Sequence, residues 1–111
     1  MNKMSLQKIK NLKNAIEYVL EHNPATRNDD AYLTVMVIKS YFPEEIIKNE
    51  KDGRFFISYE ITRIIREDHV KRIRAKIQNE ERRFLPTDPM VAKKRGWAEE
   101  EWRKALGYNS N

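Results

Sequence analysis

The sequence contains no cysteine, and it has only two histidines and three glycines in 111 residues. Without cysteine the chain forms no disulfide, no cysteine-ligated zinc site and no thiol nucleophile, which favours an intracellular setting. His22 and His69 stand far apart, and neither has an acid at a spacing typical of metal binding or acid–base catalysis. The glycines form no phosphate-binding loop. We therefore expect no enzyme activity, no metal and no cofactor.

Long apolar runs are also missing. The apolar stretches are short and interrupted by lysine, far below the roughly 20 residues that cross a membrane. Residues 1–13 lack the apolar run of a signal peptide. We expect a soluble, cytoplasmic protein without membrane contact. At this length the chain buries roughly 60 to 70% of its unfolded surface, which predicts one domain over residues 1–111.

The positive charge is concentrated in the middle of the chain. The sequence has 22 Lys and Arg against 17 Asp and Glu, a net charge of +5. Residues 54–95 hold twelve Lys and Arg against six Asp and Glu, whereas residues 1–53 are balanced at eight each. If the protein binds a polyanion, we expect the middle segment, residues 54–95, to bind it.

The first half of the sequence predicts two helices. Apolar residues recur at helical spacing over residues 5–21, and this N-terminal helix ends near Asn23, before Pro24. Asn28, Asp29 and Asp30 offer N-cap side chains for a second helix, residues 30–41, whose centre is apolar nearly all round. We expect this second helix at the centre of the core.

The following segment predicts a short strand and a further helix. Residues 44–53 are charged and end in a turn signal, Asp52-Gly53, and residues 55–57 are a β-favouring apolar run. Ser58 is placed to cap a helix over residues 59–65. Near the end of the chain, a short helix from about Ala98 to Gly107 is expected, with Trp97 and Trp102 more suited to packing over the core than to stacking on bases.

A basic helix is predicted from Asp68 to about Arg83. Its apolar residues Val70, Ile73 and Ile77 lie on a face rotated roughly 150° from the face of residues 61, 64 and 65, so one straight helix cannot bury both. The simplest solution is a break within residues 66–68, with Asp68 as N-cap. This is a helix-turn-helix.

The predicted fold is mainly α, a helix-turn-helix or winged-helix-like single domain with at most a short β element. Its parts are an N-terminal helix (5–23), a helix-turn-helix core (24–95) and a C-terminal helix and tail (96–111). In a winged helix, the strand at 55–57 would pair with a wing formed by residues 82–87. A plain helix-turn-helix bundle is the alternative.

The solvent face of the basic helix is the candidate site. Small Ala75 at its centre suits close approach to a groove, and the surrounding polar and basic side chains are types that contact bases or phosphates. Gln78 flanks this face, and residues 93–95 are further candidates, although they also suit a solvated helix end. The alternative for the whole face is an ordinary solvated surface. The predicted nucleic-acid-binding residues are His69, Lys71, Arg72, Ala75, Lys76, Asn79, Arg82 and Arg83.

Two motifs carry a family resemblance. The run Arg72-x-Arg74-x-Lys76-Ile77-Gln78, followed by Phe84-Leu85-Pro86-Thr87, resembles small proteins of the early or replication modules of phages and prophages of Gram-positive bacteria. The turn Arg27-Asn28-Asp29-Asp30 is similar to the opening motif of the same family. The resemblance covers residues 24–95. It implies a viral, intracellular setting in the host cytoplasm and a winged-helix-like fold, without implying a mechanism.

Two functions follow as hypotheses. The first is a non-enzymatic, phage-type DNA-binding protein that acts in regulation or replication by occupying double-stranded DNA. The alternative is a phage effector that binds a host protein and inhibits a defence or replication enzyme. A homodimer is a further expectation, with the helix at 5–21 as its candidate interface.

Overall fold

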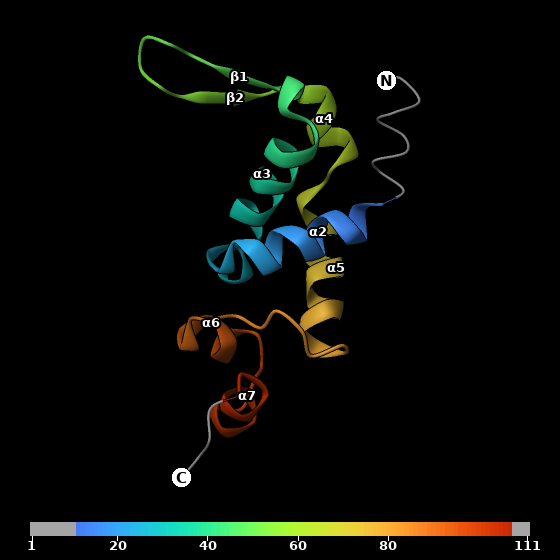
Figure 1. The fold of residues 1–111 in the computed structure, drawn as a ribbon, viewed down its shortest axis with the longest axis vertical. Helices are drawn as coiled ribbons and strands as arrows, with labels where there is room; N and C mark the ends of the chain where they lie inside the picture. Colours follow the sequence, from blue (N-terminus) through green and yellow to red (C-terminus); the bar gives the residue numbers. More distant parts are fainter. Residues whose placement is uncertain (1–10, 108–111) are drawn as a thin grey trace.

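The computed structural model describes residues 11–107, and these form six α-helices and one two-stranded sheet in an elongated molecule (Figure 1). The predicted mainly α single domain is confirmed. In chain order the elements are α2 (Leu12–His22), α3 (Asp30–Tyr41), β1 (Ile46–Lys48), β2 (Phe55–Ile57), α4 (Tyr59–Ile64), α5 (Glu67–Asn79), α6 (Pro89–Lys94) and α7 (Glu99–Ala105).

The core lies between α2, α3 and α5, with contributions from α4. The predicted central helix is confirmed as α3, and the Asp29 carboxylate caps it by accepting a hydrogen bond of 3.1 Å from the backbone N–H of Tyr32. The N-terminal helix ends at His22 as predicted, whereas its expected first residues, 5–10, lie outside the described part of the chain. The fully buried core residues of these two helices are Ile16, Leu20, Leu33, Val37 and Ile38.

The break between the last two predicted core helices is present, at Ile65 and Arg66. Ser58 caps α4 as predicted, since its hydroxyl accepts from the Ile61 N–H. The prediction of Asp68 as N-cap of α5 is wrong, because Arg66 occupies that position. Asp68 lies in the first turn instead, where a carboxylate is favoured by the helix dipole and where it pairs with Arg66.

Helix α5 is shorter than predicted and ends at Asn79, not near Arg83. Arg82 and Phe84 both adopt left-handed backbone conformations, with φ of 54° and 50°. These turns direct Phe84 back against the core, and its carbonyl accepts a hydrogen bond of 2.9 Å from Gln78 Nε2. The helix therefore ends one turn earlier than predicted, and the turn that follows packs the partly buried Phe84 against the core.

The predicted strand at 55–57 forms, but its partner is not the expected wing. It pairs antiparallel with β1, which precedes it, in the register Ile46 to Ile57 and Lys48 to Phe55. Residues 82–87 form no strand. The loop 49–54 closes this hairpin with an Asp52 side chain that accepts from the Arg54 N–H, and with Gly53 at φ 73°.

The C-terminal part adds two short helices below the core in Figure 1. Helix α7 begins at Glu99 and is followed by Gly107, as predicted. The structural interpretation of the tryptophans fits Trp102, which is buried and donates through Nε1 to the Pro86 carbonyl at 2.9 Å. Within the range 11–107, no helix is long and apolar enough to cross a membrane.

Candidate nucleic-acid interface

The solvent face of α5 carries most of the predicted site residues. Of these, only Ala75 is half-buried, where the sequence predicted exposure. Lys71 and Lys76 form no ion pair with any described residue, and Arg72 pairs only with Asp68, at 3.4 Å on the surface. The predicted residues exposed on this helix are His69, Lys71, Arg72, Lys76 and Asn79.

The opposite side of α5 is fixed to the core by apolar contacts. Val70 and Ile77 are fully buried as predicted, whereas Ile73 is only half-buried and packs at the margin. Helix α5 touches both α3 and α2 through this side. The rotation of the helix about its axis is therefore set by these contacts, which leave the basic face outward.

A buried ion pair adds a second constraint on α5. Arg74 donates from Nε and Nη2 to the two carboxylate oxygens of Asp30 on α3, each at 2.8 Å. Burial alone would raise the pKa of Asp30, but the hydrogen bond from Arg74 and the charges of Arg74 and Arg95 outweigh it and hold that pKa below its usual value. The two parallel hydrogen bonds fix the orientation of the Arg74 guanidinium relative to the Asp30 carboxylate. They therefore hold α5 in one position against α3.

Gln78 extends this pair into a network that holds the C-terminal part. Its Nε2 donates to the Phe84 carbonyl, and its Oε1 accepts from Arg95 Nη1 at 3.1 Å. The same Arg95 nitrogen donates to the Arg27 carbonyl, before α3. Gln78, predicted to flank the solvent face, is fully buried instead, because it lies one turn after Arg74 on the core side.

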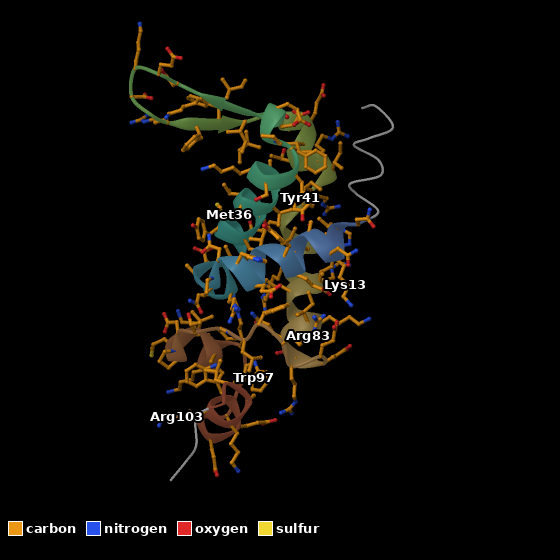
Figure 2. All side chains as sticks on the ribbon, in the orientation of Figure 1. Lys13, Met36, Tyr41, Arg83, Trp97 and Arg103 are labelled. Atoms are coloured by element: carbon orange, nitrogen blue, oxygen red, sulfur yellow. The ribbon has the colours of Figure 1, made fainter. Side chains whose placement is uncertain are left out.

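Arg82 and Arg83 are exposed, but both are engaged by acidic side chains. Arg82 donates to Glu101 of α7 and lies over the Trp97 ring, 5.5 Å from its centre. Arg83, which is labelled in Figure 2, pairs with Glu17 at 2.9 Å and with Glu81 at 2.7 Å. The hydrogen bond that Arg83 donates to the Glu81 carboxylate raises the pKa of Arg83. Both arginines follow the end of α5 at Asn79, and each is already paired with an acidic side chain, although exposed ion pairs of this kind are weak.

The cations at the end of α6 separate into two groups. Lys93 and Lys94 are exposed in its last turn, where the helix dipole favours positive charge, in agreement with the solvated-end interpretation. Arg95 points inward to Arg27 and Gln78, so it is not part of an exposed basic cluster.

Sequence reasoning missed Arg74 as a structural residue. The signal was present, because Val70, Arg74 and Gln78 recur every four residues and therefore share one helical face. A polar residue within an apolar stripe requires a buried partner, and the nearest acidic candidate in the core helix is Asp30.

Comparison with known proteins finds no match to a protein-family model, to a curated protein or to a solved structure. Among the described residues, no group of three or more His, Asp or Glu side chains lies close enough to hold a metal ion. The site is accordingly characterised by its own geometry: a rigidly anchored helix with an outward basic face.

Proposed function

We propose that this chain binds double-stranded DNA through the solvent face of α5. The single observation that carries the proposal is the position of Lys71, Arg72 and Lys76, which are all exposed on a helix whose other side is fixed by Val70, Ile77 and the Arg74–Asp30 pair. A helix anchored in this way presents its cations on a fixed backbone, so the ordering cost of binding is confined to the side chains themselves.

The side chains on this face are suited to both kinds of DNA contact. Lysine and arginine neutralise phosphates and bind guanine, and asparagine, here Asn79, binds adenine in the major groove. Two acidic residues, Glu67 and Asp68, lie in the first turn of α5, and Asp68 is paired with Arg66 and Arg72. Desolvation would raise the pKa of Asp68, but the charges of these two arginines help to hold it below the usual value. Its charge is thus neutralised beside the basic face.

The proposed role is occupation of DNA in regulation or replication, without a catalytic step or cofactor, in the cytoplasm of a bacterial host. The sequence motif of residues 72–78 and its resemblance to phage early proteins support this setting. The predicted Arg82 and Arg83 belong to the proposal as secondary contacts, since a phosphate would have to displace Glu101, or Glu17 and Glu81.

Titration of random-sequence duplex DNA at several salt concentrations tests this function. Each phosphate contact lowers the logarithm of the affinity by about 0.9 per tenfold rise in salt. We expect a slope of about −2 to −3 if the three exposed cations of α5 each hold one phosphate. Absence of binding at low salt would refute the proposal.

A second candidate function is the binding of another protein, as an effector of a host enzyme. The observation that favours it is a cavity of about 440 Å³ between α6 and α7, lined by Met90, Trp97 and Trp102 among other residues. Met90 is 63% exposed at this cavity, and methionine adapts to varied apolar partners. Tight binding of a host protein together with salt-insensitive or absent DNA binding would favour this candidate.

A further inference from the structure

A small polar pocket lies at the C-terminal end of α5, separate from the apolar cavity between α6 and α7. Its volume is about 220 Å³, below the roughly 300 to 1,000 Å³ of sites that hold drug-sized molecules, so it suits one small group. Figure 2 labels one of its residues, Trp97. The residues that line this pocket, which we call the α5-end pocket, are Asn79, Arg82, Arg95, Gly96, Trp97 and Glu101.

Arg95 lines the α5-end pocket with hydrogen-bond donors that no protein group uses. Its Nη1 donates to Gln78 Oε1 and to a backbone carbonyl, whereas its Nη2 lies 3.8 Å from Asp30, beyond hydrogen-bond distance. Every N–H of a guanidinium is a donor, so Nε and Nη2 carry donors that bond to none of the described residues. These nitrogens reach solvent, because Trp97 Nε1 is the only fully enclosed side-chain nitrogen or oxygen without a partner in residues 11–107. An oxyanion in the pocket would supply the missing acceptors.

The charge of Arg95 is incompletely compensated by the protein. Burial lowers the pKa of Arg95 most, and the positive charge of Arg74 lowers it further. The charges of Asp30 and Asp29 act in the opposite direction, yet the pKa of Arg95 stays below its usual value. The protein thus stabilises this charged guanidinium less well than water does, and a bound anion would offset the deficit.

Arg82 brings a second guanidinium to the α5-end pocket, where it is paired with Glu101. Arg82 Nη2 donates to the Glu101 carboxylate, and the guanidinium lies over the Trp97 ring, 5.5 Å from its centre. The side chains of Arg82 and Glu101 are 55% and 49% exposed, and ion pairs this exposed contribute little to stability. An anion that also bonds to Arg95 can therefore displace Glu101 from Arg82 at a small cost.

The α5-end pocket continues the basic face of α5. Arg72, Lys76 and Asn79 are exposed and are spaced four and three residues apart, so they lie along one side of the helix. Asn79, the last residue of α5, also lines the pocket. A group bound in the pocket therefore lies at the end of the row of exposed side chains that begins with Arg72.

We propose that the α5-end pocket binds a phosphate group. Arg95 and Arg82 donate to its oxygens, the Asn79 amide adds a neutral donor, and the phosphate replaces the Glu101 carboxylate. Guanidinium groups suit this role because their planar N–H donors match the geometry of phosphate oxygens. Two sources carry the group, a phosphate ion free in solution and the backbone of DNA. The second source rests on the proposed function, and it makes the pocket a further phosphate contact beside the α5 face.

Titration with inorganic phosphate in the absence of DNA tests the pocket directly. The nuclear magnetic resonance signal of the Asn79 side-chain amide is followed up to about 50 mM phosphate, at constant ionic strength so that general screening does not change. We expect a saturable shift in the wild type. Glu101→Gln should bind phosphate about two- to fivefold more tightly, because the competing carboxylate is gone. Glu100→Gln, which removes the same charge one residue away on α7, should bind like the wild type.

A second pair of variants tests the arginine. Arg82→Gln should weaken phosphate binding by about tenfold, the loss typical of one hydrogen bond to a charged group. Arg103→Gln is the matched control, since Arg103 is 59% exposed and is also paired with a glutamate of α7, Glu99. It should bind phosphate like the wild type. Circular dichroism checks the fold of all four variants.

Absence of a saturable shift in both the wild type and Glu101→Gln would overturn the proposal. Equal phosphate affinities of Glu101→Gln and Glu100→Gln, or of Arg82→Gln and Arg103→Gln, would overturn it as well. The salt slope of duplex DNA binding then identifies the source. A slope reduced by up to about 0.9 in Arg82→Gln, but not in Arg103→Gln, indicates the DNA backbone, and an unchanged slope indicates free phosphate. Since the phosphate titration contains no DNA, failure of DNA binding leaves its result intact.

Discussion

Arg74 occupies a position on α5 that is in line with Val70 and Gln78 and is almost completely shielded from solvent. A buried guanidinium is tolerated only when it is paired and hydrogen-bonded, and Asp30 supplies two of the required acceptors. The pair therefore acts on the site indirectly. It fixes the helix that presents Lys71 and Arg72 without itself being available to a ligand.

Replacing Arg74 should expose this role as a loss of stability. Arg74→Ala leaves the partly buried Asp30 carboxylate without its main partner, and the loss of one member of a buried pair typically costs about 3 to 5 kcal/mol. Arg72→Ala, two residues away and exposed, should change the free energy of unfolding by at most about 0.5 kcal/mol. Urea denaturation measures both. Equal losses in the free energy of unfolding for the two variants would show that the Asp30–Arg74 pair does not stabilise the fold.

The pH dependence of stability should report on Asp30. Its pKa is lower in the folded protein than in the unfolded chain, so the unfolded state binds more protons as the pH falls. The stabilisation is fully present above the unfolded value of about 4 and is lost as the pH falls through the lower folded value. Urea denaturation from about pH 6 to pH 3 should show a steeper loss for wild type than for Asp30→Asn. An equal dependence of stability on pH in wild type and Asp30→Asn would contradict a lowered pKa of Asp30 in the folded protein.

At the scale of the element, α5 is defined by an apolar side and a basic side. Ile77→Ala removes fully buried side-chain atoms and should destabilise by about 2 to 5 kcal/mol. The adjacent Lys76→Ala removes an exposed side chain and should stay within about 0.5 kcal/mol of wild type. Ile73, which is half-buried, should give a smaller loss than Ile77. A thermal unfolding series in which Lys76→Ala matches Ile77→Ala would mean that the helix is rotated differently.

The elements that sequence predicted well have strong local signals. Helix α3 has an Asp29 cap and a continuous apolar centre, and α4 has the Ser58 cap. The two apolar stripes, rotated relative to each other, required the break that the structure has at Ile65 and Arg66. Each of these features depends on residues close together in the chain, and such local rules apply without knowledge of the tertiary structure.

The elements that sequence missed depend on contacts between distant residues or on short segments. Strand β1 has only three residues and becomes a strand by pairing with β2. Helix α6 has six residues, although Asp88 before Pro89 is an N-cap signal that was available. In the site, the exposed cations of α5 followed from helical periodicity. The hydrogen bonds that Arg95 donates to Gln78 and Arg27 could not be predicted in this way, because they join residues 17 and 68 positions apart in the chain.

At the scale of the whole molecule, different surfaces carry different chemistry. The outward face of α5 is basic, the hairpin at one end is apolar with a slight excess of acidic residues, and the α6–α7 end carries an apolar cavity (Figure 1). The Asp30, Arg74, Gln78 and Arg95 network joins the core to the C-terminal part and fixes the α6–α7 end relative to α5. Under the proposed function, polyanion binding should therefore depend on where a cation lies and not only on net charge.

The most direct test compares two double variants that remove the same charge. Lys71→Ala with Arg72→Ala removes two cations from the α5 face, and Lys93→Ala with Lys94→Ala removes two exposed cations from the end of α6. The measurement is the slope of log affinity for duplex DNA against log salt concentration, with unfolding curves to verify that both variants fold. The α5 variant should lower the magnitude of the slope by up to about 1.8, or about 0.9 for each phosphate contact, while the α6 variant keeps the wild-type slope. Equal slopes in the two variants, or an unchanged slope in the α5 variant, would contradict binding through α5.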